Sequence, residues 1–276
     1  MKSLDANKRH NLFERAISAV VLLPIAIWLT WLGGWPFAAL VAVAAVLGAS
    51  ELLLMFGRLR LAEWYGVAVA GAIPLTAALH RGDTLLPDWS PLALAFATLG
   101  LFGVLLFTHE EQAEVPARAG RVALAWLYCG LLASTLVGLR VQGGTAWVVL
   151  AFVVTWANDT FAYFAGMFFG KHKLYEKVSP KKTWEGFAGG ALGSVFGALV
   201  IRSTLLPEIP VPLAVLLGAG ASLLGPMGDF TESLLKRAAG VKDSGKLIPG
   251  HGGLLDRIDA LLFVVPWVYL FVRWLG

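Results

Sequence analysis

The sequence predicts an all-α integral membrane protein with about nine transmembrane helices. The prediction rests on the composition, the spacing of the apolar stretches and the distribution of basic residues. Of the 276 residues, 58% are hydrophobic and only 14% are charged, and the mean hydropathy is +0.73. Soluble domains carry roughly 25% charged residues. This composition therefore excludes an ordinary water-soluble globule.

Nine apolar stretches approach the length of about 20 residues that one transmembrane helix requires. The first could be mistaken for a signal peptide. However, it has a basic leader and continues directly into the second stretch through Gly33-Gly34-Trp35-Pro36, which favours a retained span. In order, the stretches are 13–33, 36–56, 64–80, 91–107, 121–140, 145–169, 184–204, 210–228 and 258–275.

The basic residues alternate between the loops on the two sides of these spans. With nine spans, 18 of the 22 Lys and Arg residues fall on the side of the amino terminus. Cytoplasmic loops are enriched in Lys and Arg, so we expect a cytoplasmic N-terminus and a C-terminus outside. The net charge of +4 is then a property of membrane loops, and no nucleic-acid partner is expected.

The polar residues divide the chain into two regions. Residues 1–140 are expected to form a scaffold of transmembrane helices, and residues 141–276 a second set of spans that carries the chemistry. Two long polar connections, 170–185 and 229–257, lie on the predicted cytoplasmic side of the second region. The single cysteine, Cys129, lies in an apolar stretch, and we expect it to be a packing residue.

Carboxylates recur in and beside the second connection. On a helix, Asp229, Ser233 and Lys236 would share one face, and Asp256 and Asp259 would share another at the start of the ninth span. Carboxylates in a membrane are costly unless they are paired or bound to a metal. Mg²⁺ is the natural partner, because it takes one or two protein carboxylates and completes its shell with water and phosphate oxygens.

Between these acids the chain reads Pro249-Gly250-His251-Gly252-Gly253. Glycines allow close approach of the backbone to a ligand, and consecutive N–H groups in such a turn can bind phosphate. An inert loop does not need three glycines around one imidazole. Simpler interpretations stay open for the charged residues: Glu232 and Lys236 could form an ordinary helix pair, and the basic residues could contact only anionic lipid.

The whole stretch closely resembles the signature of phosphatidate cytidylyltransferases, also called CDP-diacylglycerol synthases. The resemblance rests on Ser233-x-Leu235-Lys236-Arg237, Lys242-Asp243-Ser244-Gly245, Pro249-Gly250-His251-Gly252-Gly253 and Asp256-Arg257-x-Asp259. Two further motifs fit, Asn158-Asp159-Thr160-x-Ala162-Tyr163 and Ser179-Pro180-Lys181-Lys182-Thr183-Trp184-Glu185-Gly186. The similarity runs from about residue 150 to the end, and the family pattern leaves Lys246 without a role.

The resemblance implies a multi-pass enzyme of the bacterial cytoplasmic membrane. It would transfer CMP from CTP to phosphatidic acid, giving CDP-diacylglycerol and diphosphate. Both substrates are polyanions, so the site must mainly cancel repulsion and hold an in-line geometry. One or two Mg²⁺ ions are implied, with a second, monovalent cation as an alternative. The sequence leaves a homodimer open.

The resemblance also implies roles for individual residues. Catalytic roles are expected for Asp229, Asp256, Lys236, Arg237, His251 and Arg257. Substrate contacts are expected from Asn158, Asp159, Ser179, Lys181, Lys182, Thr183, Ser233, Lys242, Gly252 and Gly253. The expected metal ligands are Asp229, Asp256, Asp259 and Asp159.

Position suggests how these residues divide the work. Lys236, Arg237 and Arg257 should lie at the membrane boundary, where a phosphatidate headgroup arrives, and the 179–183 segment should be a mobile basic loop that closes on the nucleotide phosphates. Asp159 could instead pair with Lys181 or Lys182. Glu185 could steady its loop rather than contact substrate, and Glu51 is expected near the cytoplasmic end of its helix, outside the site.

Two other classes of protein share some of these features. A polytopic transporter of an anionic substrate would also carry intramembrane acids and glycine-broken helices, but the inner-loop charges concentrate in the last 120 residues and no repeated halves are visible. A CDP-alcohol phosphotransferase requires the dense run D-G-x₂-A-R-x₈-G-x₃-D-x₃-D, which this sequence lacks.

Overall fold

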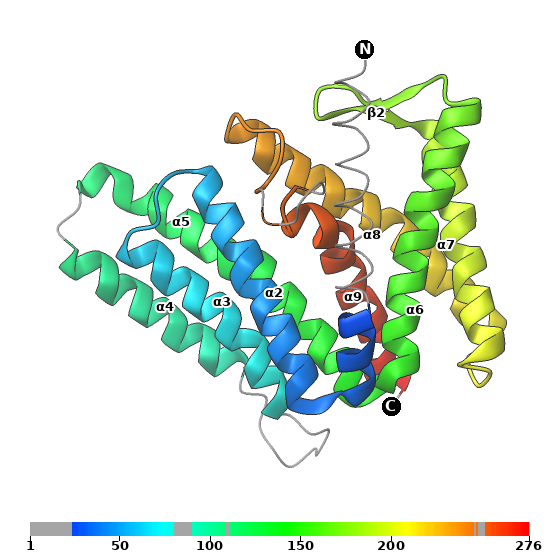
Figure 1. Ribbon diagram of the computed structural model, residues 1–276, viewed down its shortest axis with the longest axis horizontal. Helices are drawn as coiled ribbons and strands as arrows, with labels where there is room; N and C mark the ends of the chain where they lie inside the picture. Colours follow the sequence, from blue (N-terminus) through cyan, green and yellow to red (C-terminus); the bar gives the residue numbers. More distant parts are fainter. Residues whose placement is uncertain (1–23, 80–89, 109–110, 246, 248–251, 276) are drawn as a thin grey trace, which may run out of the picture.

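The computed structural model describes residues 24–79, 90–108, 111–245, 247 and 252–275. Within these residues the chain is built from helices, with one short β-hairpin (Figure 1). Six helical segments are long and apolar enough to cross a membrane. Large apolar side chains such as Phe96, Leu106 and Leu192 point outward and are 64%, 75% and 71% exposed. Soluble proteins rarely expose so many large apolar side chains to water. Together with the six helices that are long enough to span a membrane, this surface indicates an integral membrane protein.

The N-terminal helices follow the predicted apolar stretches. Residues 24–32 are helical, and α2 (Gly34–Met55), α3 (Leu61–Leu79) and α4 (Ser90–Phe107) follow. Gly33, with a φ of 66°, separates the first two. Residues 13–23 of the first predicted span, 13–33, lie outside the described residues. A buried ion pair joins α3 to α5 (Val115–Ala125), with 2.6 Å between Glu63 Oε1 and Arg118 Nε.

The middle of the chain is one long helical run. A short 3₁₀ turn (Gln112–Glu114) leads into α5 (Val115–Ala125), a π-helical turn (Trp126–Leu131) and α6 (Leu132–Phe169). At about 1.5 Å per residue, 58 residues far exceed the roughly 30 Å of a bilayer core. The predicted spans 121–140 and 145–169 therefore meet at a kink, where Gly144 has a φ of 79°.

A β-hairpin replaces the first predicted loop. Strands β1 (Lys173–Tyr175) and β2 (Ser179–Thr183) pair antiparallel, with Lys173 opposite Thr183 and Tyr175 opposite Ser179. The predicted connection over 170–185 thus contains a β-hairpin. β2 leads directly into α7 (Trp184–Thr204), which packs along α6.

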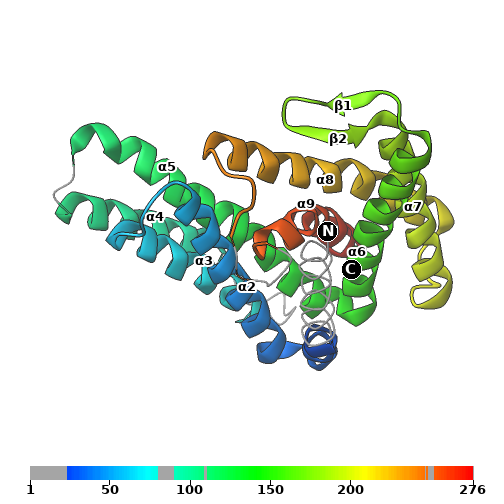
Figure 2. The same ribbon diagram turned by 45° about the horizontal axis from the view of Figure 1, so that its top comes forward.

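The last two helices frame the second predicted loop. α8 spans Val211–Ala238 and α9 spans Leu255–Leu275. α8 does not stop at residue 228, so residues 229–238, expected to belong to a loop, are helical. α9 packs against both α6 and α8, whereas α7 covers their outer side (Figures 1 and 2).

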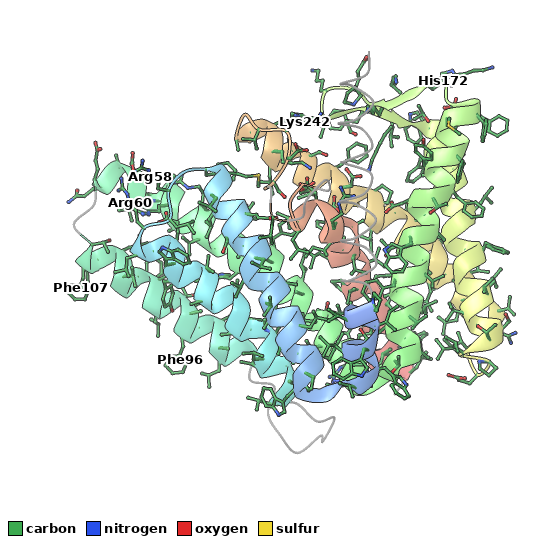
Figure 3. The ribbon with its side chains drawn as sticks, in the orientation of Figure 1. Arg58, Arg60, Phe96, Phe107, His172 and Lys242 are labelled. Atoms are coloured by element: carbon green, nitrogen blue, oxygen red, sulfur yellow. The ribbon has the colours of Figure 1, made fainter. Side chains whose placement is uncertain are left out.

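The polar connections gather at one end of the molecule. The α2–α3 turn, the hairpin and the connection after α8 lie at the top of Figure 1, where Figure 3 marks Arg58, Arg60, His172 and Lys242. The C-terminus lies at the opposite end. This arrangement agrees with the prediction that these loops lie on the same side of the membrane.

Candidate active site

A cavity of about 440 Å³ opens where α6, the hairpin, α7 and α8 meet. Six residues that the sequence singled out line it, from three separate segments of the chain: Asn158, Asp159, Lys181, Lys182, Thr183 and Asp229. Two cations, an amide, a hydroxyl and two carboxylates thus face one space. The lysines suit an anionic ligand, and the carboxylates suit a cation bound together with that ligand.

The α6 wall carries an amide and an acid. Asn158 is only 3% exposed, and its Nδ2 has no hydrogen-bond partner among the described residues. Buried amide donors are nearly always satisfied, so this free donor beside the cavity indicates a place for a ligand acceptor. Asp159 forms no ion pair within 4 Å in the described part of the chain, although Lys182, which pairs with Asp229, lies near enough to act on it electrostatically. The alternative that Asp159 pairs with Lys181 or Lys182 stays open.

The hairpin is anchored on α8 by Lys182. Its Nζ lies 2.8 Å from Asp229 Oδ2 and 4.5 Å from the centre of the Phe230 ring. Tyr175 of β1 packs on the same ring, with 6.0 Å between ring centres. In Figure 2 the hairpin extends beside α8. The segment 179–183, expected to be a mobile basic loop, is thus a strand docked on α8 in this structure.

Thr183 at the end of β2 and Glu185 in the first turn of α7 have structural partners. The Thr183 side chain is 7% exposed, and its hydroxyl accepts a hydrogen bond of 3.1 Å from the Gly186 N–H, which caps α7. Ser179 does not line the cavity. Glu185 accepts hydrogen bonds from the N–H groups of Lys171 and His172, which favours the alternative that it steadies this segment.

Three acids from three helices approach one another beside the cavity. Asp159, Asp229 and Asp259 lie close enough to interact electrostatically. The backbones of α8 and α9 approach closely at Gly228, where a Cβ would collide with the Asp259 carbonyl oxygen and lie only 3.0 Å from Ala260 Cα. Ser233 Oγ donates to Asp229 Oδ1 at 3.3 Å, which confirms their shared helix face.

These acids fit a hard divalent cation, because they supply oxygen ligands and their mutual repulsion would fall when a cation binds. Within the described residues no three His, Cys, Asp or Glu side chains are grouped tightly enough to hold an ion as they stand. A bound ion would thus need part of its shell from ligand oxygens or water.

A second polar centre lies between α8 and α9. Lys236 is buried; its Nζ bonds to Glu232 and lies 2.5 Å from Asp256 Oδ1. Glu232 is 1% exposed, and its Oε1 has no partner among the described residues. Lys236 is therefore bonded inside the protein, and Glu232 is not half of a surface pair. The i to i+4 spacing predicted that Glu232 and Lys236 pair, but it did not predict that both side chains are buried.

Asp256 organises the start of α9. Its Oδ2 accepts hydrogen bonds from Ser244 N–H (3.0 Å), Ser244 Oγ (2.9 Å) and Gly253 N–H (2.9 Å). The Gly253 N–H, expected to bind phosphate, is thus occupied inside the protein. A metal ion at Asp256 would compete with Lys236 for Oδ1.

The remaining predicted residues lie at the polar end. Lys242, Arg237 and Arg257 are exposed, and Arg237 Nη1 donates to the Val241 carbonyl at 3.3 Å. Gly252 has a φ of 84°, which is the left-handed conformation that its glycine-rich setting predicts. His251 and Lys246 lie outside the described residues.

Glu51 is a residue that the sequence analysis placed outside the site. It lies in the last turn of α2, as expected, but its carboxylate accepts hydrogen bonds from Leu254 N–H, Leu255 N–H and Ser244 Oγ. In the sequence, Glu51 is recognisable only as an acidic residue near the end of a span. That position does not reveal a partner about 200 residues away.

Comparisons with known proteins show the family of the chain. A family model described as the cytidylyltransferase family matches residues 13–275. A phosphatidate cytidylyltransferase of Brucella abortus (strain 2308) is 36% identical over 272 residues, which is 95% of this chain and 93% of that protein. Proteins of the same name from Bacillus subtilis (strain 168) and Thermotoga maritima are 34% and 32% identical over 93% and 94% of this chain, and both alignments cover 96% of those proteins. Because the family model and these relatives span nearly the whole sequence, the chain belongs to the cytidylyltransferase family.

Proposed function

We propose that this protein is a phosphatidate cytidylyltransferase. It transfers CMP from CTP to phosphatidic acid, and the products are CDP-diacylglycerol and diphosphate. The observation that carries the proposal is the cavity in which Asn158, Asp159, Lys181, Lys182 and Asp229 converge beside a membrane-spanning bundle. The names of the full-length relatives supply the substrates.

The cavity residues suit the triphosphate. Lys181 and Lys182 offset its negative charge, and the free Asn158 amide donates to a nucleotide oxygen. Lys182 would exchange its bond to Asp229 for one to a phosphate oxygen. The phosphate oxygen of phosphatidate then attacks the α-phosphorus of CTP, and the bond from that phosphorus to the bridging oxygen of the departing diphosphate breaks.

Asp229 and Asp256 would hold Mg²⁺, with Asp259 and Asp159 as further ligands. When bound, Mg²⁺ neutralises charge on the phosphates and stabilises the attacking and leaving oxygens. The mutual repulsion of Asp159, Asp229 and Asp259 supports a cation at this place. A monovalent second cation stays the alternative to a second Mg²⁺.

The exposed basic residues suit the lipid phosphate. Arg237, Lys242 and Arg257 lie at the polar end of α8 and α9, where a headgroup would lie at the membrane surface. Lys236 is buried against Asp256, and these contacts favour a role in holding that carboxylate rather than in binding the headgroup. His251 keeps its predicted catalytic role.

The proposal includes the membrane arrangement. The protein would cross the bacterial cytoplasmic membrane nine times, with the N-terminus and the hairpin in the cytoplasm and the C-terminus outside. The common end of the hairpin and the α2–α3 turn supports this orientation (Figure 1). A homodimer stays a prediction, and the mass of the purified protein in detergent tests it.

The test is product formation by the purified chain. With CTP labelled in its α-phosphate, phosphatidate in mixed micelles and Mg²⁺, we expect the label in the lipid phase as CDP-diacylglycerol and an equal amount of diphosphate. Asp229→Asn serves as a control for a contaminating enzyme. A transporter of an anionic substrate would release no diphosphate from CTP, and that result would reject the proposed function.

A further inference from the structure

One acidic side chain reaches the active-site segment from the predicted scaffold. Glu51 of α2 is 7% exposed. Its Oε1 accepts a hydrogen bond from Leu254 N–H at 2.9 Å, and its Oε2 accepts one from Leu255 N–H at 2.9 Å. This carboxylate ties the end of α2 to the beginning of α9.

The bonds fall where a helix needs them. The first N–H groups of a helix have no partner within it, and the positive end of the helix dipole favours a carboxylate there. Asp256 satisfies the Gly253 N–H, and Glu51 satisfies the next two. Two carboxylates therefore share three consecutive N–H groups at the start of α9.

Ser244 couples the two carboxylates. Its Oγ lies 2.9 Å from Asp256 Oδ2 and 3.1 Å from Glu51 Oε2, and the side chain is buried. The hydroxyl has one proton, so it donates to one carboxylate at a time. A change in the position of Glu51 would therefore alter the hydrogen bonding of Asp256.

Two motif glycines fit around the same carboxylate. A Cβ on Gly245 would lie 2.7 Å from Glu51 Oε1, and a Cβ on Gly253 would lie 2.5 Å from Glu51 Oε2. Both distances are too short for real Cβ atoms. The absence of side chains at these positions thus makes room for Glu51, in addition to any role toward phosphate.

Glu51 does not face the proposed nucleotide cavity. It lines a separate cavity of about 390 Å³ with Ser244 and Asp243, and none of that cavity's lining residues lines the larger one. A direct contact with CTP is therefore not part of its role.

We propose that Glu51 is a positioning residue for cytidylyl transfer. It fixes Ser244 and the start of α9 against α2 and, through Ser244, sets the orientation of the Asp256 carboxylate. This inference rests on the proposed function and extends it to the N-terminal half of the chain.

The test compares Glu51→Gln with two other variants of the full-length protein. Glutamine keeps the size of the side chain, but its amide nitrogen cannot accept a hydrogen bond, so either Leu254 N–H or Leu255 N–H loses its acceptor. We expect a fall in kcat of about 10–100-fold, as for partners that orient catalytic ligands, with much smaller changes in the KM values for CTP and phosphatidate. Glu51→Asp, which keeps both acceptor oxygens, should recover part of the lost kcat.

Glu63→Gln is the matched control. Glu63 is a buried acid on the neighbouring helix and pairs with Arg118, so its loss weakens the fold without touching the 244–255 segment. This variant should unfold at a lower temperature but keep the wild-type kcat in its folded fraction. Hydrogen exchange of the 252–258 peptide should be faster in Glu51→Gln and unchanged in Glu63→Gln.

Three results would overturn the inference: an unchanged kcat in folded Glu51→Gln, an equal loss of kcat in Glu63→Gln, or unchanged exchange at 252–258. Failure of the proposed function looks different. In that case the wild-type protein forms no CDP-diacylglycerol, and the positioning role for this reaction falls with it. The exchange measurement then reports only whether Glu51 holds the segment.

Discussion

Lys182 of β2 and Asp229 of α8 form an ion pair of 2.8 Å, which fastens the basic hairpin to a helix that carries a proposed metal ligand. The two side chains are 26% and 38% exposed, so water and incoming ions reach the pair. A cation that binds Asp229 would release Lys182, and a triphosphate would attract it. The pair thus couples binding of the cation at Asp229 to binding of the triphosphate at Lys182.

The first prediction separates the two substrates. Lys182→Ala should raise the KM for CTP by about 10-fold, since a hydrogen bond to a charged group contributes roughly 1.5–3 kcal/mol, and should change kcat less. Arg237→Ala should instead raise the KM for phosphatidate. Kinetics with one substrate varied and the other saturating decide between them. Lys177→Ala, an exposed hairpin lysine outside the cavity lining, is the control. Exchanged or equal shifts would reject the assignment of the two basic clusters.

The second prediction concerns Asp256. Asp256→Asn should nearly abolish turnover while the protein still inserts and purifies as folded material. An amide cannot accept from both the Ser244 and Gly253 N–H groups and also neutralise Lys236. Lys242→Ala removes only an exposed charge and should be milder. Turnover numbers for the two variants, measured on equal amounts of folded protein, test the ranking. Similar turnover in both would argue against a central role for Asp256.

The third prediction concerns Glu232. A surface helix pair would contribute only about 0.2–0.5 kcal/mol, but Glu232 is 1% exposed. Removing one partner of a buried ion pair costs about 3–5 kcal/mol. Glu232→Ala should therefore lower the unfolding temperature clearly and reduce activity through Lys236. Thermal unfolding in detergent measures the effect, and a wild-type unfolding temperature would show that the pair adds little stability.

The fourth prediction concerns Thr183. Its hydroxyl caps α7, so Thr183→Ala should cost about 1 kcal/mol of stability. Thr183→Ser keeps the cap and should behave like the wild type in unfolding and in the KM for CTP. If Thr183→Ser binds CTP as poorly as Thr183→Ala, the methyl group rather than the cap matters for the site.

The fifth prediction concerns the metal. Removing divalent ions with a chelator should stop turnover, and added Mg²⁺ should restore it. Asp229→Asn and Asp159→Asn should each raise the Mg²⁺ concentration needed for half-maximal activity, because each removes a charged oxygen ligand beside the cavity. Titrations of activity against Mg²⁺ provide the measurement. Unchanged Mg²⁺ dependence in both variants would exclude these acids as ligands.

The sequence indicated the cavity well because short motifs fix local geometry. Asn158 and Asp159 are adjacent on one helix, and Lys181, Lys182 and Thr183 share one strand. Once the fold brings the segments together, these residues line the cavity as groups. The apolar stretches likewise predicted the helices, because helix length in a membrane follows the bilayer thickness.

Burial and distant partners could not be predicted in the same way. Spacing placed Glu232 and Lys236 on one face, but only the packing of α8 against α9 buries them. The bond from Glu51 to Leu255 joins residues 204 positions apart, and no pattern in one sequence encodes such a distance. Gly144 shows the same limit, because a polar interruption of the apolar pattern fits a loop as well as a kink.

The close crossing of α8 and α9 at Gly228 has a consequence for the acids beside it. A Cβ there would strike the backbone of α9, so backbone contact rather than side-chain flexibility fixes the separation of Asp229 and Asp259. Two carboxylates on freely moving helices would drift apart in the absence of a cation. Here the packing of α8 against α9 holds the two carboxylates near each other. The free energy of helix packing offsets their repulsion when the protein folds, before any substrate binds. The site is thereby preorganised for positive charge.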